Sequence, residues 1–148
     1  MSTRNALPLS ATHLVRDNCL CLHVQRAARG LARRFDDVFR PLGLTHGQFS
    51  LLMSLNRPEP PTIGSVAALL AMDRTTLTAA LKPLERRKLV KVSIDKEDKR
   101  SRRLAITSAG RALLAKAFPL WTHTHAEIER LIPHGTANDL REALRSLA

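Results

Sequence analysis

Residues 73–107, DRTTLTAALKPLERRKLVKVSIDKEDKRSRRLAIT, decide the fold that this sequence predicts. Asp73 is a residue type that caps helix N-termini, and we expect a helix from Arg74 to about Lys88. The next apolar residues alternate with polar ones, as is typical of two strands: Val90, Val92 and Ile94, then Leu104 and Ile106. Residues 95–101, between these strands, are highly charged and contain no apolar side chain. The stretch therefore predicts a helix followed by a hairpin with a charged tip.

A second, shorter helix is predicted just before this stretch. It covers residues 63–70, and we expect its apolar residues Val66, Leu69 and Leu70 to be buried. Residues 71–73 then form a three-residue turn. Two short helices joined by such a turn fit the helix-turn-helix pattern, and the hairpin that follows makes the lobe a winged helix.

Long helical segments flank this lobe on both sides. Residues 12–42 carry apolar side chains spaced by seven, namely Leu14, Cys21, Ala28, Phe35 and Leu42. Because a helix this long is hard to bury in so small a chain, its apolar stripe indicates packing against another subunit. The second segment, 108–148, contains Pro119, which should kink its first helix because proline lacks a backbone N–H.

These patterns predict a single domain, residues 1–148, of mainly α class with a small β-hairpin wing. A winged helix-turn-helix lobe spans 45–106, after a helix C-cap at Gly43 and with a helix N-cap at Thr45. Residues 12–42 and 108–148 form the long N- and C-terminal dimerisation helices.

The charge of the chain points to a polyanionic partner. Its 24 Lys and Arg residues outweigh 13 Asp and Glu residues, for a formal net charge of +11. Residues 74–103 alone hold eleven basic and four acidic residues. Such a concentrated basic segment is typical of phosphate binding. Since it contains no aromatic residue on which bases could stack, it favours duplex DNA over single strands.

Other classes of function find little support in the sequence. There is no phosphate-cradling glycine-rich loop and no supported catalytic pair, so we expect no enzyme and no cofactor. The histidines, His123 and His125 included, do not form a coherent metal-ligand set, so we expect no metal. No stretch approaches the length of a membrane span, so we expect a cytoplasmic protein without a membrane partner.

Several motifs of the sequence resemble the MarR family of bacterial transcriptional regulators. They are Gly43-Leu44-Thr45 with Gln48-Phe49, Asp73-Arg74-Thr75-Thr76-Leu77-Thr78, Leu84 to Val90, Asp95 to Ser101, and Leu104-Ala105-Ile106-Thr107 with Gly110. The resemblance implies a homodimer, a palindromic operator with two half-sites, and repression relieved by a small-molecule effector or an oxidant. Lys88 departs from the family, which usually has glycine after the recognition helix. In a left-handed C-cap, lysine would cost roughly 1 kcal/mol.

The helix from Arg74 should enter the major groove of DNA with its N-terminal turns facing the bases. Arg74 can pair bidentately with guanine, and the hydroxyls of Thr75, Thr76 and Thr78 can reach bases or phosphates. Lys82 is expected to contact phosphate. The alternative is that Thr75 caps the helix and Thr78 merely faces solvent.

In the wing, the resemblance places Arg100 in the minor groove, with Asp98 holding its guanidinium by a charge-assisted hydrogen bond. Arg102 and Arg103 occupy adjacent strand positions, so only one of them, taken as Arg102, can face DNA. The alternative is a solvated tip whose charges only aid solubility. The sequence thus favours a sequence-specific, double-stranded DNA-binding transcriptional repressor over a nonspecific or architectural DNA-binding protein.

Cys21 is a candidate redox sensor. In the OhrR-like branch of the MarR family, a peroxide-sensing cysteine precedes the threonine of the Leu-Thr pair by 24 residues, which is also the separation of Cys21 and Thr45. That branch surrounds its cysteine with tyrosines, and Phe35 stands where one is expected. The alternative is that Cys21 is a small buried residue of the helical seam, where apolar surroundings would leave the thiol inert.

Overall fold

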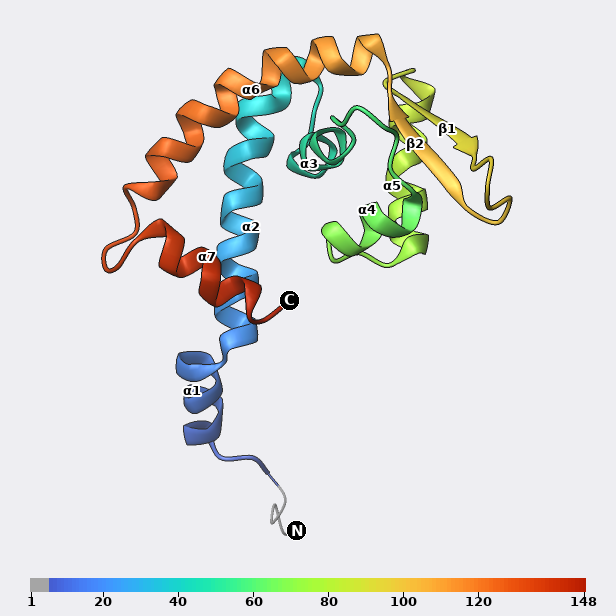
Figure 1. Ribbon diagram of the computed structural model, residues 1–148. Helices are drawn as coiled ribbons and strands as arrows, with labels where there is room; N and C mark the ends of the chain where they lie inside the picture. The colour runs from blue at the N-terminus through green and yellow to red at the C-terminus, as the bar shows by residue number, and fades with distance from the viewer. Residues whose placement is uncertain (1–5) are drawn as a thin grey trace.

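A computed structural model describes residues 6–148, so the first five residues of the predicted domain lie outside the described part of the chain (Figure 1). Eight helical segments and one hairpin follow in the order α1 (Leu9–Asn18), α2 (Leu20–Phe39), the 3-10 turn η1 (Arg40–Leu42), α3 (His46–Ser54), α4 (Ile63–Leu69), α5 (Arg74–Arg86), β1 (Val90–Ile94), β2 (Arg102–Ile106), α6 (Ser108–Glu129) and α7 (Ala137–Arg145). The predicted class, mainly helical with one antiparallel hairpin, is confirmed.

The N-terminal segment is not the single helix that its spacing predicted. It breaks at Cys19, which has an extended backbone (φ −70°, ψ 110°) and caps α2 by accepting a hydrogen bond from Leu22 N–H at its Sγ. Figure 1 shows α1 set off from the long axis of α2. At the other end Pro41, which lacks an N–H, converts the last turn into η1, and Gly43 closes it at φ 64° as predicted.

The core lies where the end of α2 meets α3, α5, the hairpin and α6. Its most deeply buried side chains are Phe39, Leu52, Leu55, Val66, Leu77, Leu84 and Leu104. Leu69 was expected to be buried but is 58% exposed, because α4 turns only one face, that of Val66 and Ala67, towards this core. Leu70 is half-buried.

The helix-turn-helix forms as predicted, with Asp73 as the cap of α5. The helix ends at Arg86, two residues earlier than expected, and Lys88 takes the left-handed conformation at φ 58°. Lys88 N–H donates to the carbonyl of Glu85, and Leu89 N–H donates to that of Leu84, both at 2.9 Å. These bonds make the helix end that usually carries glycine, with lysine in its place.

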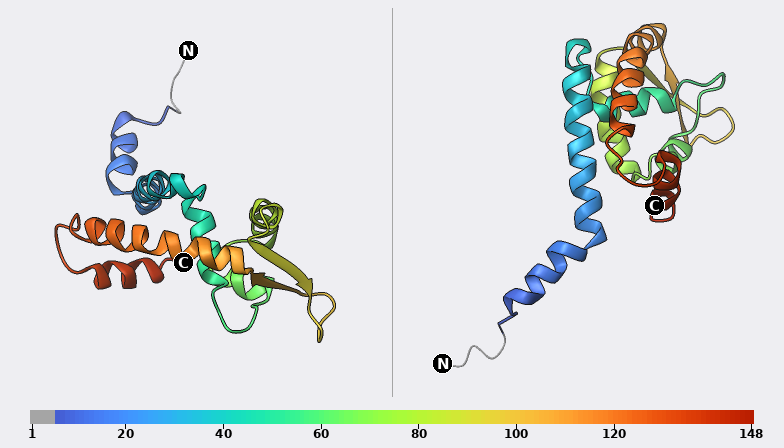
Figure 2. Two further views of the ribbon diagram at one scale, coloured as in Figure 1. Left: turned by 90° about the horizontal axis from the view of Figure 1, so that it is seen from above. Right: turned by 90° about the vertical axis from the view of Figure 1, so that its left-hand side faces the viewer.

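The wing is a regular antiparallel pair in which Val90 faces Ile106 and Ile94 faces Arg102. Its base is tied to the loop before α4, since Leu104 N–H donates to the Pro61 carbonyl at 2.9 Å. Figure 2 shows the hairpin projecting from the body of the lobe.

The C-terminal helices enclose the other side of the molecule. Figure 1 shows α6 curving along its length and α7 folding back beneath it, and Pro119 lies inside α6. Arg141 of α7 donates to Glu129 of α6 at 3.0 Å. The last helix of the segment 108–148 covers Ala137–Arg145, with Thr136 as its cap. No helix among residues 6–148 is long and apolar enough to cross a membrane.

Candidate nucleic-acid interface

Helix α5 has one buried and one exposed face. Leu77, Leu81 and Leu84 point into the core. The predicted DNA-contacting residues of this helix are all exposed, namely Arg74, Thr75, Thr76, Thr78 and Lys82. The burial of the leucine face therefore turns a row of hydroxyls and cations towards solvent.

The first turn of α5 is closed by Asp73 rather than by Thr75, so the alternative role considered for Thr75 is wrong. The carboxylate of Asp73 accepts from Thr76 N–H and from the Thr76 hydroxyl, both at 2.8 Å. These two bonds, the backbone one first, hold the pKa of Asp73 below its usual value. The Thr76 hydroxyl thus serves the cap, and the side chain of Thr75 is left exposed.

Further along α5, the Thr78 hydroxyl donates to the Arg74 carbonyl at 2.8 Å. Its methyl group therefore remains the part of Thr78 free to meet a base. The guanidinium of Arg74 lies against Gly64 of α4, where an added Cβ would come within 2.9 Å of Nη2. A glycine at this point of α4 leaves the space that the Arg74 side chain occupies.

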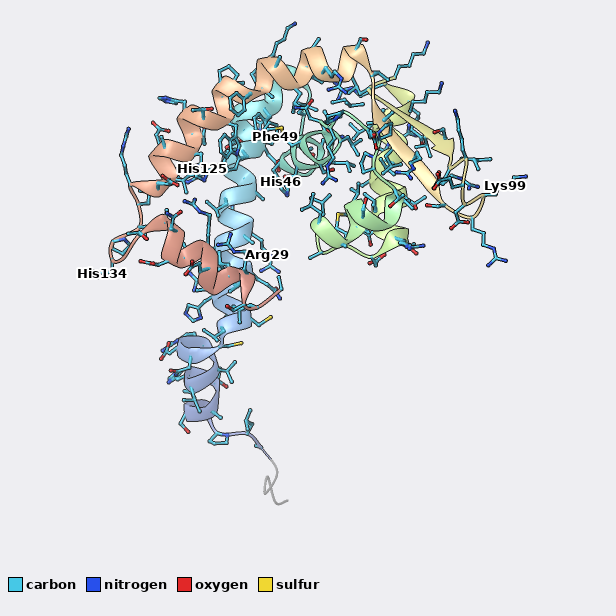
Figure 3. The ribbon with its side chains drawn as sticks, in the orientation of Figure 1. Arg29, His46, Phe49, Lys99, His125 and His134 are labelled. Atoms are coloured by element: carbon cyan, nitrogen blue, oxygen red, sulfur yellow. The ribbon has the colours of Figure 1, made fainter. Side chains whose placement is uncertain are left out.

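One contact predicted for the wing tip does not form. Asp98 accepts a hydrogen bond from the backbone N–H of Arg100 at 3.0 Å, and no ion pair with the Arg100 guanidinium occurs in the described chain. Asp side chains commonly bond the backbone two residues ahead in turns, and that local bond wins here. The Arg100 side chain is exposed, and Figure 3 shows the neighbouring Lys99 at the outer end of the hairpin.

Arg102 and Arg103 point to different sides of β2, as expected. Arg102 is exposed and donates to the Lys99 and Ser101 carbonyls at 3.2 and 3.3 Å. Arg103 is partly buried and donates to the Pro60 carbonyl at 3.0 Å and to Asp95 at 3.4 Å. Arg103 therefore holds the loop before α4 to the wing, a role that the sequence did not indicate.

Arg87 is a second basic residue with a role that sequence reasoning missed. Its Nη1 donates to the Gly43 carbonyl at 2.6 Å and its Nη2 lies 3.5 Å from the Leu42 carbonyl. No local signal could have found this contact, because its partners lie 44 and 45 residues earlier in the chain.

Cys21 is exposed, so within a single chain it is not the buried seam residue considered as an alternative. Its Sγ accepts a hydrogen bond from Gln25 Nε2 at 3.1 Å. Cys19 is also a free thiol. Among residues 6–148 there is no group of three or more His, Cys, Asp or Glu residues able to hold a metal ion.

Two cavities lie along the contact of α3 with α6. One, of about 480 Å³, is lined by Met53, Asn56, Arg111, Leu114, Ala115 and Phe118. The other, of about 390 Å³, is lined by Phe49, Ser50, Met53, Ser54, Leu69, Leu70, Phe118 and Trp121. Their walls are mainly apolar, and Arg111 is the one cation lining them, with its guanidinium bonded to Asn56 at 2.7 Å.

Comparison with known proteins gives a consistent result. The family model described as "MarR family" matches residues 44–101. The organic hydroperoxide resistance transcriptional regulator of Bacillus subtilis is 29% identical over 105 residues, which are 71% of each chain. The crystal structure of the M. tuberculosis transcriptional regulator MosR in complex with DNA is 37% identical, with a TM-score of 0.79 over 88% of this chain and 93% of that one.

A third similar structure is the transcriptional repressor CouR of Rhodococcus jostii RHA1, solved on a 23-mer DNA duplex. It is 28% identical, with a TM-score of 0.71 over 97% of this chain and 96% of that one.

Proposed function

This chain belongs to the MarR family of transcriptional regulators, and from that premise we propose that it is a cytoplasmic homodimeric repressor that binds a palindromic operator in double-stranded DNA. Binding is relieved by a small-molecule effector or by oxidation. The regulators of this family act by binding rather than by catalysis, so no enzymatic activity is proposed.

The observation that carries the proposal is the exposed face of α5 beside a wing with an unpaired cation at its tip. Arg74, Thr75 and Thr78 stand at the end of α5 that a winged helix presents to base edges. Lys82 stands one turn further along and is placed to contact phosphate. Arg100 can enter the minor groove because no carboxylate within the described chain holds its guanidinium. Thr76, Asp98 and Arg102 support these contacts by shaping the cap and the wing.

The apolar surface of the long helices supports a homodimer. Large apolar side chains are exposed along α1, α2 and α7, among them Leu14, Leu20, Leu31, Leu140 and Leu144, and Leu147 just after α7 is exposed as well. Helix α7 also places its leucines on one face. Apolar side chains that line up along whole helices mark a surface for another protein, and a second copy is the partner that fits.

Two features support relief of binding. The cavities along α3 and α6 offer apolar walls and one cation to a small molecule that carries a negative charge. Cys21 offers an exposed thiol that an oxidant can reach, and the similar B. subtilis protein is named for resistance to organic hydroperoxides. Mass spectrometry after mild peroxide treatment, run alongside DNA binding, tests the redox route. Oxidation of Cys21 without loss of DNA binding would rule out the redox route.

Selection of bound duplexes from a random pool tests the proposed function. We expect a two-fold symmetric consensus that the purified protein binds roughly a thousandfold or more tightly than random duplex at the same salt concentration. Equal affinity for the consensus and for random duplex would instead indicate an architectural DNA-binding protein.

A further inference from the structure

Arg87 connects the end of the recognition helix to the end of the dimerisation helix. It is the C-cap residue of α5, and its guanidinium donates to the carbonyl of Gly43, just after η1. We propose that Arg87 is a positioning residue that sets the separation and relative orientation of the two recognition helices in the dimer. It would thereby determine which half-site spacing the protein accepts, an inference that rests on the proposed function.

The contact depends mainly on the 2.6 Å bond from Nη1 to the Gly43 carbonyl, with Nη2 at 3.5 Å from the Leu42 carbonyl. The carbonyls of Leu42 and Gly43 lie at the C-terminal end of η1, where the helix dipole favours a cation. Gly43 adopts φ 64°, and a Cβ at this position would lie 3.3 Å from Arg87 Nη2. The glycine that ends the dimerisation helix therefore also leaves room for the guanidinium.

In the part of the chain that the structure describes, the other polar link between the lobe and α2 is the pair Asp36–His46, which holds α3 and not the recognition helix. Of the hydrogen bonds and ion pairs in this part, only the two made by Arg87 join residues 74–90 to residues 6–45. Helix α5 also packs against α4 and β1, and its leucines share the core with Phe39 at the end of α2, so Arg87 adds a directional bond to apolar packing. Arg87 thus ties the recognition helix directly to the segment that continues α2, which places the lobe relative to the proposed dimer axis.

DNA geometry makes such a tie measurable. Each added base pair moves a half-site by roughly 3.4 Å along the duplex and rotates it by roughly 35° about its axis. A dimer whose lobes are held firmly loses affinity when the half-site spacing changes. A dimer whose lobes can shift binds the altered spacing with less loss of affinity. Loss of Arg87 should therefore broaden the accepted spacing rather than abolish contact with each half-site.

The test measures affinity for the selected operator and for versions with one base pair inserted or removed at its centre. Wild type, Arg87→Ala, Arg87→Lys and Arg86→Ala are compared at several salt concentrations. Arg86 is the matched control, because it is adjacent, exposed and basic but makes no side-chain hydrogen bond among residues 6–148. We expect Arg87→Ala to reduce the preference for the native spacing about tenfold, the effect of one exposed charge-assisted bond lost in each protomer. Arg87→Lys, which keeps a charged donor, should retain most of the preference for the native spacing.

A second measurement is independent of DNA. Spin labels are placed at Glu85→Cys on α5 in a Cys19→Ser, Cys21→Ser background, and the distance distribution between the two labels of the dimer is recorded. Wild type at position 87 should give a narrow distribution, and Arg87→Ala a broad one.

Three results would overturn the inference. They are an unchanged spacing profile, an unchanged distance distribution, and an affinity loss equal at all spacings with a smaller salt dependence, which would make Arg87 a phosphate contact. If the wild-type protein shows no preference for the operator over random duplex, the proposed function is wrong. The label distances would still decide whether Arg87 positions the helices.

Discussion

Backbone strain in this chain is carried by single residues, and Lys88 is one of them. Its φ of 58° places a side chain in the left-handed region that favours glycine. The helix end forms nevertheless, because the backbone bonds of Lys88 and Leu89 and the hydrogen bond from the Thr107 hydroxyl to the Lys88 carbonyl at 2.7 Å hold it in place.

Replacing Lys88 with glycine should therefore stabilise the fold. We expect Lys88→Gly to raise the free energy of unfolding by about 1 kcal/mol, measured by urea denaturation. The control is Arg86→Gly, two residues earlier in the last turn of α5, which should lower stability by a similar amount because glycine is a poor helix former. A loss of stability in Lys88→Gly would contradict the account of strain.

Arg100 is the residue whose proposed role in DNA recognition is easiest to isolate. Its side chain is exposed, while its backbone N–H is held by Asp98, so truncation removes the guanidinium without disturbing the turn. We expect Arg100→Ala to weaken operator binding by roughly 1–3 kcal/mol in a titration at fixed salt. Lys96→Ala, which removes another exposed cation of the wing, should weaken operator binding less than Arg100→Ala does. Equal affinities of wild type and Arg100→Ala would remove Arg100 from the interface.

At the scale of elements, the helices begin where the sequence places side-chain caps. Thr45, Thr62, Asp73, Thr107 and Thr136 each accept a hydrogen bond from the backbone N–H three residues ahead. Such caps act over three residues, which is why these starts could be predicted from the sequence within a residue.

The Asp73 cap has a consequence for pH dependence. Its lowered pKa means that the folded state holds the carboxylate more tightly deprotonated than the unfolded state does. This contribution is present above the usual Asp pKa of 3.8 and is lost as the pH falls through the lower folded value. We expect wild type to lose melting temperature more steeply between pH 5 and pH 3 than Asp73→Asn, which keeps an oxygen for the cap but no titrating group. Parallel curves for the two proteins would contradict the assignment.

Asp36 makes the same kind of contribution where α2 meets α3. It accepts from the backbone N–H and from the ring Nδ1 of His46, at 2.7 and 2.9 Å, and these bonds lower its pKa. Because Asp36 remains in the Asp73→Asn variant, a residual pH dependence of stability is expected there.

At the scale of the whole molecule, the structure divides into a lobe with a closed core and long helices that lack one. The buried residues of α2 reduce to Phe39 at its end, and α1 and α7 bury none. Helices of this kind gain most of their stability from packing against a partner, here a second copy.

Introducing a charge on the apolar face of α7 should therefore separate the subunits. We expect Leu144→Asp to shift the protein from dimer to monomer in sedimentation equilibrium and to lose operator affinity with it. Leu144→Met, which preserves apolar volume, should remain dimeric. A dimeric Leu144→Asp protein would show that α7 lies outside the interface.

Local patterns determined much of this protein. The helix starts at their caps, the alternation in β1 and β2 and the glycine turn after η1 could be predicted, because each depends on residues close in the chain. The left-handed position at Lys88 was inferred instead from the resemblance to a family that usually has glycine there. The same reasoning failed where a local pattern competed with an unseen bond: the long N-terminal helix breaks at Cys19, and Asp98 holds a backbone N–H rather than the Arg100 guanidinium.

Alternation along the strand already predicted that only one of Arg102 and Arg103 can face DNA, but only the tertiary structure decided which groups hold the arginines of residues 74–103. Arg103 bonds the Pro60 carbonyl and Asp95, and Arg87 bonds the Gly43 carbonyl. Their backbone partners lie 43 and 44 residues away and come within reach only when the wing packs on the loop before α4 and α5 meets the end of η1. Side-chain spacing along one segment cannot encode such contacts, because they depend on how separate elements pack in space.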